Sequence, residues 1–287
     1  MLYTNVLEAL LRFALVERGY VLLHSGCVSR DGRATLLSAQ TDTGKTSTVI
    51  RLVRDYGYSF LSDDMTIVSP NGQALRYPKP MTMSYHTMSA IAGAHLPFGR
   101  RAKLSVQSRV HSKSGRSVGR ALGLRNIPIM AINSATQIAV PPPKFHITSL
   151  VGCEVAEKAE IDRVVFIERG ESVRETMSLK AAVSKLIENT DDAYGFPPFA
   201  TFAPHLRIGP LSYLELRNRE AALLAQAIAN TELLRLQIPG HGWAELIADL
   251  DRERPATEPT TSMVGFPIEP SADDVEQTQT ELLRGRN

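Results

Sequence analysis

The chain opens with a helical pattern of apolar positions and continues with short, strand-like runs. Residues 4–18 carry apolar side chains at three- and four-residue intervals, which predicts an amphipathic helix. Two apolar runs follow, residues 20–28 and residues 34–39, on either side of Asp31 and Gly32. Because Asp-Gly is a typical hairpin turn, these two runs are predicted to pair as a β-hairpin.

Helical and strand-like patterns alternate through the rest of the chain up to about residue 240. The strands expected here span residues 58–61, 65–68, 74–77 and 161–167. The helices expected here span residues 46–56, 178–189 and 218–236. A Pro-Gly pair at residues 239–240 is expected to end the last of these helices.

The composition is that of an ordinary globular protein. Of 287 residues, 43% are hydrophobic and 22% are charged, which excludes a wholly disordered chain, a collagen and a coiled coil. The formal net charge of +2 argues against a nucleic-acid binder held by bulk charge. The two cysteines form no CxxC pair, so neither a disulfide framework nor a structural zinc site is expected.

The N-terminal apolar stretch lacks the features of a membrane anchor. Residues 6–23 contain four charged side chains, whereas a membrane span needs about 20 mostly apolar residues. A signal peptide would need a basic start, an apolar run and a small-residue cleavage site, and this pattern is absent from the sequence. We therefore expect a cytoplasmic protein that contacts no membrane.

Two segments depart from the average composition. Residues 100–125 contain eight basic residues and no acidic ones, with frequent Gly and Ser, and are expected to form a mobile basic loop. Residues 251–287 are rich in Pro, Thr and Glu and are expected to form a disordered tail. Residues 1–250 are therefore expected to form one large domain.

A phosphate-binding sequence lies between the predicted hairpin and the helix that follows it. It matches the Walker A pattern GxxxxGK[ST] except at its first position, where an alanine replaces glycine. A loop that leads into a helix N-terminus offers backbone N–H groups and a favourable dipole to an anion. The predicted nucleotide-binding residues are Ala39, Gln40, Thr41, Asp42, Thr43, Gly44, Lys45, Thr46 and Ser47.

The residue types in this loop suit a nucleoside triphosphate with magnesium. Gly44 lets the backbone approach the phosphates, the Lys45 ammonium can span the β- and γ-phosphates, and the Thr46 hydroxyl can ligate Mg²⁺. If position 39 needed a positive φ, Ala39 would cost on the order of 1 kcal/mol there. The sequence therefore predicts binding of a nucleotide such as ATP.

Two carboxylates and a histidine are further candidates for the chemistry. Asp63 and Asp64 follow Lys45 at a distance that fits one helix and one strand, so they are predicted to lie near the phosphate loop. One carboxylate can reach the metal, and the other can accept a proton from an attacking hydroxyl. His24 ends an apolar run, and a lone histidine in such a place is more often structural than catalytic.

The chain resembles the catalytic domain of HPr kinase/phosphorylase in three segments, which are His24–Gly26, residues 39–46 and Leu61–Asp64. A looser resemblance extends to the wider group of HPr-kinase-like kinases, which includes peptide kinases of lasso-peptide pathways and free-serine kinases. The resemblance covers about residues 20–70, and beyond them it extends only to the strand-like segment IDRVVFIERG at residues 161–170. It implies that residues 1–250 form a catalytic domain with an α/β P-loop fold related to phosphoenolpyruvate carboxykinase, with a mixed sheet and C-terminal helices.

The resemblance also implies roles for the site residues. Lys45 and Thr46 would bind phosphates and Mg²⁺, and His24 would lie close to the transferred phosphate. Asp63 would be the base that activates the acceptor hydroxyl, and Asp64 would be the carboxylate on the metal side. The implied cofactors are ATP and Mg²⁺. Enzymes of this group often form homo-oligomers. The sequence gives no support for HPr as the substrate or for the reverse phosphorolysis.

The sequence therefore predicts an ATP-dependent kinase that transfers the γ-phosphoryl group to a hydroxyl acceptor. The acceptor is a serine of a peptide or protein, or a small hydroxylated metabolite, and the sequence does not choose between them. Two alternatives stay open: a non-catalytic nucleotide-binding sensor and a simple ATPase. GTP and pyrophosphate also stay open as donors, because a phosphate loop recognises phosphates rather than bases.

Overall fold

The computed structural model describes most of the chain outside one long internal segment and the C-terminus. The described residues are 3–40, 43–77, 79, 81–82, 144–149, 151–194 and 198–253. The predicted basic loop at residues 100–125 and all but the first few residues of the predicted tail lie outside them. Residues 1–251 make up one compact unit and residues 252–287 a second, and every strand described below belongs to the first.

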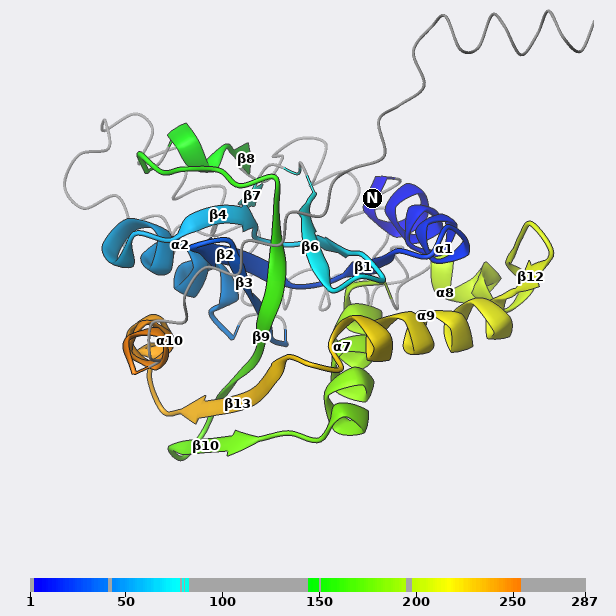
Figure 1. Cartoon of the computed structure of the whole chain (residues 1–287). Helices are drawn as coiled ribbons and strands as arrows, with labels where there is room; N and C mark the ends of the chain where they lie inside the picture. The colour runs from blue at the N-terminus through cyan, green and yellow to red at the C-terminus, as the bar shows by residue number, and fades with distance from the viewer. Residues whose placement is uncertain are drawn as a thin grey trace, which may run out of the picture. The chain divides into compact units, whose positions relative to one another are not determined.

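A mixed sheet forms the centre of the first unit (Figure 1). Its strands are β1 (Val21–Leu23), β2 (Gly26–Arg30), β3 (Arg33–Ser38), β4 (Ser59–Ser62), β5 (Thr66–Val68), β6 (Gln73–Arg76), β9 (Lys158–Arg169), β10 (Val173–Thr176) and β13 (Glu232–Ile238). They run in the order β1-β5-β6-β9-β3-β2-β4, while β13 and then β10 continue beside β9. Strand β9 pairs in parallel with β3 and β13, and the other strand pairs are antiparallel.

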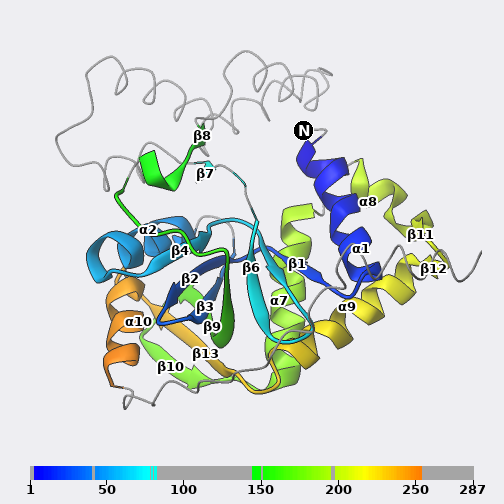
Figure 2. The same cartoon turned by 45° about the horizontal axis from the view of Figure 1, so that its top comes forward.

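Helices cover both faces of this sheet. The longer helices are α1 (Ala9–Glu17), α2 (Lys45–Tyr56), α7 (Leu179–Tyr194), α9 (Tyr213–Ala227) and α10 (Trp243–Arg252). The shorter elements are η1 (Tyr3–Glu8), η2 (Ile147–Ser149), α8 (Phe199–Phe202), η3 (Ala203–His205) and the strand pairs β7 (Met81–Thr82) with β8 (Lys144–Phe145) and β11 (Arg207–Ile208) with β12 (Leu211–Ser212). Helices α2 and α10 cover one face, and α7 and α9 cover the other (Figure 2).

The central strands supply two separate core layers because successive strand residues point to opposite faces. Leu37 of β3 and Val165 of β9 are fully buried in the layer shared with α2 and α10. Their sequence neighbours Leu36 and Val164 are fully buried in the layer shared with α7 and α9. The predicted α/β class with a mixed sheet is therefore confirmed.

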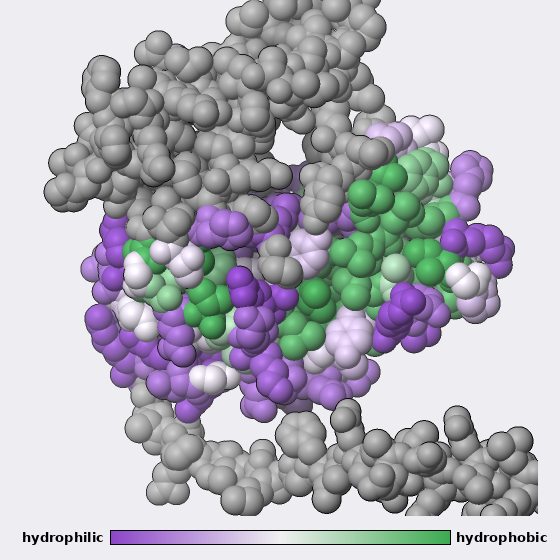
Figure 3. Space-filling view, turned by 90° about the horizontal axis from the view of Figure 1, so that it is seen from above, coloured by the Kyte–Doolittle hydropathy of each residue, from purple (hydrophilic) through white to green (hydrophobic). Residues whose placement is uncertain are grey.

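The N-terminal helix packs on one side only. Ala9, Phe13 and Val16 are fully buried in a third core cluster together with residues of α8 and α9. Figure 3 shows one broad apolar area on the right of the described surface. Leu7 of η1 and Leu11 of α1 are 54% and 37% exposed. None of the helices in the described residues is both long enough and apolar enough to cross a bilayer.

Most of the predicted elements are present. Strands β2 and β3 form the expected hairpin, and its turn places Asp31 and Gly32 at positive φ, 51° and 76°. Helix α2 ends at Gly57, which takes the left-handed conformation typical of a helix C-terminus. The predicted run at residues 20–28 is divided, since β1 and β2 pair with different strands on either side of His24.

The helix predicted over residues 218–236 is wrong in its second half. Helix α9 ends at Ala227, and the chain then forms β13, which pairs with β9 on one edge and β10 on the other. Leu233 of β13 enters the core layer with α7, whereas Leu234 enters the layer with α10. Leucine has a high helix propensity, and this local preference is overridden by pairing and burial on both sides of the strand.

Candidate active site

The candidate site lies where two neighbouring segments of the chain leave the sheet together. His24 and Ser25 separate β1 from β2, and Asp63, Asp64 and Met65 separate β4 from β5. Because β1 pairs with β5 and β2 pairs with β4, the two strand interruptions lie next to each other in the sheet. The Thr66 hydroxyl donates to the Ser25 carbonyl at 3.1 Å and joins the two breaks. Side chains far apart in the sequence are thereby brought together.

Helix α2 begins directly beside these breaks, and a glycine allows this approach. A Cβ added at Gly26 would lie 2.7 Å from Val49 Cγ2 and 3.2 Å from the Asp63 carbonyl oxygen. Only glycine therefore lets β2 pass this close to α2 without a shift of either element. The same closeness holds the first turn of α2 against the carboxylate segment.

A second glycine forms the end of the phosphate loop. Gly44 has a φ of 129° and is the N-cap of α2. A Cβ there would lie 3.2 Å from the Trp243 ring and 3.3 Å from His241 Nδ1. The Ser47 hydroxyl donates to the Gly44 carbonyl at 2.7 Å, so this predicted ligand group is engaged by the loop itself. The loop backbone is therefore fixed by packing from α10 and by its own first helical turn.

The rest of the loop is anchored at both ends. Ala39 is buried, with 2% of its surface exposed, and does not have a positive φ, so the strain expected for alanine there does not arise. The Thr43 carbonyl accepts a hydrogen bond from Arg169 Nε at 3.1 Å. The predicted ligands Thr41 and Asp42 lie outside the described residues.

Lys45 extends from the first turn of α2 into the site. Its ammonium is buried and has no hydrogen-bond partner in the described part of the chain; it lies 3.9 Å from Asp64 Oδ1. Burial lowers the pKa of Lys45, and the nearby charges of Asp64 and Asp63 offset only part of that effect. A buried ammonium without a partner is unfavourable, and an incoming anion would supply the missing acceptors.

Thr46 and Asp63 form a neighbouring pair of oxygen ligands. The Thr46 hydroxyl donates to Asp63 Oδ2 at 3.1 Å, while Asp63 Oδ1 is buried and lacks a partner among the described residues. Burial raises the pKa of Asp63 to about 6, although the charge of Lys45 and the hydrogen bond from Thr46 favour the ionised form. A carboxylate beside a hydroxyl is a set of oxygen donors that Mg²⁺ accepts.

Asp64 has a different set of neighbours. Its Oδ1 lies 3.3 Å from His24 Nε2, and its Oδ2 accepts a hydrogen bond from Lys79 Nζ at 2.9 Å. Burial alone would raise the pKa of Asp64, but the hydrogen bond from His24 and the charges of Lys45 and Lys79 outweigh it and hold the pKa well below its usual range. The side chain is 42% exposed, so an incoming molecule can reach it.

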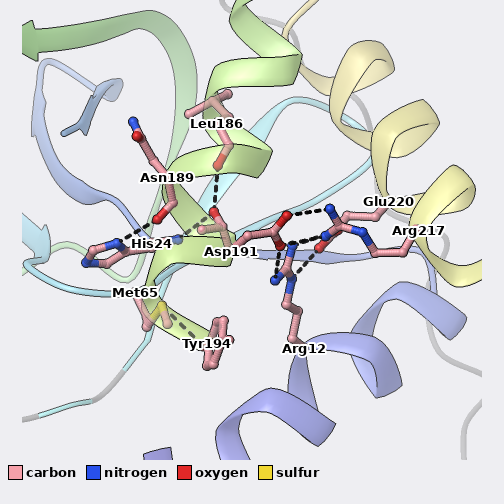
Figure 4. Close-up of polar contacts among 10 residues, drawn as sticks. Arg12, His24, Met65, Leu186, Asn189, Asp191, Tyr194, Arg217 and Glu220 are labelled. Atoms are coloured by element: carbon pink, nitrogen blue, oxygen red, sulfur yellow. Dashed lines mark hydrogen bonds and ion pairs between the residues drawn. The ribbon is translucent and has the colours of Figure 1, made fainter. Parts of the chain in front are cut away.

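His24 is held in place by helix α7. Its backbone N–H donates to the Thr190 hydroxyl at 3.2 Å, and its Nδ1 lies 3.1 Å from the Asn189 carbonyl oxygen (Figure 4). Because a carbonyl oxygen can only accept, Nδ1 carries a proton in this contact. The other ring nitrogen, Nε2, faces Asp64 Oδ1 at 3.3 Å.

A cavity of about 430 Å³ opens beside the phosphate loop, at the carboxyl ends of the parallel strands β3 and β9. Ligands of open α/β sheets bind at this end of the strands. Asn189 connects the cavity to the site, because its side-chain amide donates to the Ser38 hydroxyl at 2.9 Å and its carbonyl oxygen lies 3.1 Å from His24 Nδ1. The residues that line the cavity are Ser38, Ala39, Gln40, Thr43, Phe166, Ile167, Glu168, Arg169, Lys185 and Asn189.

The structure thus places the predicted residues His24, Lys45, Thr46, Asp63 and Asp64 around the start of α2. It also adds polar residues that the sequence analysis did not select. These are Lys79, which contacts Asp64, Asn189, which contacts Ser38, and Arg169, which contacts the phosphate loop. None of the three belongs to the three segments on which the resemblance rests. Lys79, for example, is a single basic residue between two prolines.

The donor set fits a metal that is shared with phosphates rather than one held by the protein alone. Within the described residues there is no group of three or more His, Cys, Asp or Glu side chains that could hold a metal ion. Mg²⁺ usually keeps several waters and is bound through one or two carboxylates together with substrate phosphates. Asp63 with Thr46 matches this mode, and the unpartnered Asp63 Oδ1 is available as a ligand.

Comparisons with known proteins give little similarity at the level of sequence. No protein-family model and no curated protein matches the chain. Among solved structures, the Hpr(Ser) kinase/phosphatase from Coxiella burnetii is 13% identical, and the match covers 80% of this chain and 93% of that one with a TM-score of 0.30. Similarity at this level does not assign the chain to a family and does not extend that protein's activity to it.

Proposed function

We propose that this protein is an ATP-dependent kinase that transfers the γ-phosphoryl group to a hydroxyl acceptor. The observation that carries the proposal lies at the start of α2, where a buried ammonium without a hydrogen-bond partner among the described residues meets two carboxylates in contrasting environments. Lys45 suits the donor phosphates, Asp63 suits the metal and Asp64 suits the acceptor. A merely structural ion pair would leave neither Lys45 Nζ nor Asp63 Oδ1 without a hydrogen-bond partner in the described part of the chain.

The phosphates would bind at the N-terminus of α2. The first turn of a helix has free backbone N–H groups, and the loop before it is fixed by contacts to Gly44 and Thr43. Phosphate oxygens would provide the hydrogen-bond partners that the Lys45 ammonium lacks. Thr46 and Asp63 would hold Mg²⁺, which neutralises charge on the β- and γ-phosphates.

We assign the two carboxylates in the reverse of the order that the family resemblance implied. Asp63 contacts the hydroxyl of Thr46 and is 6% exposed, which suits the metal side. Asp64 is 42% exposed and fixed by His24, which suits a group that meets the acceptor. During transfer the acceptor oxygen forms a bond to the γ-phosphorus, its proton passes to Asp64, and the bond to the bridging oxygen of the departing ADP breaks.

Mass spectrometry of reactions with ATP and Mg²⁺ tests the proposal, with peptide and metabolite acceptors in separate pools. A gain of one HPO₃ unit on an acceptor is expected with the wild-type chain and not with Lys45→Ala. Lys180→Met is the matched control, because Lys180 is an exposed lysine on α7. Transfer that persists in a folded Lys45→Ala protein would refute the proposal. Nucleotide binding without transfer would favour a sensor, and phosphate release without an acceptor would favour an ATPase.

A further inference from the structure

Lys79 brings a second ammonium group into the proposed site. Its Nζ donates to Asp64 Oδ2 at 2.9 Å and to Glu8 Oε2 at 3.0 Å. Lys79 follows strand β6, and Glu8 is the last residue of η1, so the contact links the N-terminal helix to the site. The Lys79 side chain is 19% exposed, so it is not fully enclosed by the chain.

The two lysines contact different oxygens of one carboxylate. Lys45 Nζ lies 3.9 Å from Asp64 Oδ1, and Lys79 Nζ lies 2.9 Å from Asp64 Oδ2. If Lys45 binds the β- and γ-phosphates and Asp64 meets the acceptor, the γ-phosphoryl group must pass between them. The Lys79 ammonium would therefore lie beside the γ-phosphoryl group during its transfer from the donor to the acceptor.

One N–H group of the Lys79 ammonium has no acceptor among the described residues. An ammonium group has three N–H donors, and Asp64 and Glu8 accept two of them. No third acceptor for it occurs within the described part of the chain. An oxygen of the transferred phosphoryl group is a suitable third acceptor, because charge-assisted hydrogen bonds from lysine to phosphate are among the stronger ones in proteins.

Glu8 is in a position that is hard to explain by structure alone. Its side chain is fully buried, and its Oε1 has no partner among the described residues, which is unfavourable for a carboxylate. The N-terminal helix does not need Glu8 as an anchor. One turn later, Arg12 donates to Glu220 at 2.7 and 2.9 Å and to Asp191 at 2.9 Å (Figure 4). The arrangement is explained if Glu8 serves to hold the Lys79 ammonium.

We propose that Lys79 is a further catalytic residue, which contacts the γ-phosphoryl group as it is transferred, and that Glu8 is its positioning residue. This inference rests on the proposed kinase function. Negative charge on the phosphoryl oxygens must be balanced while one P–O bond breaks and another forms. Lys79 supplies a positive charge at the Asp64 oxygen that Lys45 does not face, and the acceptor proton still passes to Asp64.

Calorimetry with two nucleotides tests this without relying on turnover. The full chain with Mg²⁺ is titrated with ADP and with a non-hydrolysable ATP analogue. Lys79→Met is expected to weaken binding of the analogue by at least about tenfold, the loss of one charge-assisted hydrogen bond, and to change ADP binding by less than about twofold. Lys79→Arg is expected to restore much of the preference for the triphosphate, and Glu8→Gln to weaken it in part. The exposed control Lys180→Met is expected to match the wild type.

The outcomes separate this inference from the proposed function. If the wild type transfers phosphate and Lys79→Met still prefers the analogue over ADP as the wild type does, Lys79 does not contact the γ-phosphoryl group. If the wild type binds neither nucleotide, the proposed function fails and the role of Lys79 fails with it. Because Lys79→Met removes the cationic partner of the buried Glu8 side chain, the double variant Glu8→Gln/Lys79→Met is titrated as well. Equal losses for both nucleotides in a folded double variant would point to a structural role and overturn the inference.

Discussion

Asp63 is a side chain whose contribution to stability is expected to oppose its contribution to function. It is 6% exposed, its Oδ1 lacks a partner in the described residues, and burial raises its pKa to about 6 from an ordinary value of 3.8. The folded chain therefore binds this proton more tightly than the unfolded chain does. By linkage, the stabilisation of the fold by protonated Asp63 is fully present below the unfolded pKa of 3.8, and it is lost as the pH rises through the folded pKa of about 6.

Replacing Asp63 with asparagine removes the ionisation and keeps an acceptor for the Thr46 hydroxyl. The shift from 3.8 to about 6 corresponds to about 3 kcal/mol at about 1.4 kcal/mol per pKa unit. Above pH 7, in the absence of metal and nucleotide, the free energy of unfolding of Asp63→Asn is therefore expected to be about 3 kcal/mol higher than that of the wild type. Near pH 4 the two proteins are expected to be equally stable.

Urea denaturation at several pH values between 4 and 8, with EDTA and without nucleotide, measures this difference. Asp64→Asn is the matched control with the opposite sign, because cationic neighbours hold the pKa of Asp64 low and its charge stabilises the fold at neutral pH. With Mg²⁺ and ATP added, the wild type is expected to gain more stability than Asp63→Asn, because the variant lacks a metal ligand. An Asp63→Asn protein that is no more stable than the wild type at pH 8, or whose advantage persists unchanged at pH 4, would refute the reasoning.

Three shorter predictions concern the helix α2 and its loop. Gly26→Ala is expected to lower the free energy of unfolding in urea by about 1–3 kcal/mol, because its Cβ would lie 2.7 Å from Val49 Cγ2. The control Gly152→Ala is expected to change this free energy little, because nothing lies within 4 Å of its Cβ. Ala39→Gly, which restores the Walker pattern, is expected not to tighten nucleotide binding in calorimetry, because position 39 does not need a positive φ; a gain of about tenfold would contradict this. Lys45→Ala is expected to leave circular dichroism unchanged and to reduce phosphoryl transfer by more than about 100-fold, and a smaller loss would remove Lys45 from the transition state.

The parts of the fold that short-range patterns decide could be predicted from the sequence. The hairpin turn at Asp31 and Gly32 and the end of α2 at Gly57 depend on residues that accept positive φ, and both occur as expected. Strand β13 could not be predicted in this way. Its leucines suit a helix equally well, and its identity depends on β9 and β10 lying on its two edges.

The candidate site shows the same division between local and long-range information. Lys45 and Thr46 belong to a contiguous motif, and the Asp63–Asp64 pair follows at a spacing that fits one helix and one strand, so all four were accessible from the sequence. The contact between Lys79 and Glu8 joins residues 71 positions apart, and neither residue belongs to a motif. Such pairs become visible only once the N-terminal helix and the end of β6 are placed side by side.

The environments of the two carboxylates fit the different demands of their proposed roles. Asp64 has close contacts at both oxygens, with His24 at one and Lys79 at the other, while Lys45 lies farther away at 3.9 Å. Asp63 receives one hydrogen bond, from Thr46, and keeps a buried oxygen without a partner among the described residues. A base must be oriented before the acceptor arrives, since proton transfer needs a fixed geometry. A metal ligand needs a free oxygen, since the ion itself supplies the missing interaction. The free oxygen of Asp63 therefore supports its assignment to the metal, and the fixed orientation and exposure of Asp64, rather than its basicity, which its cationic neighbours lower, support its assignment to the acceptor.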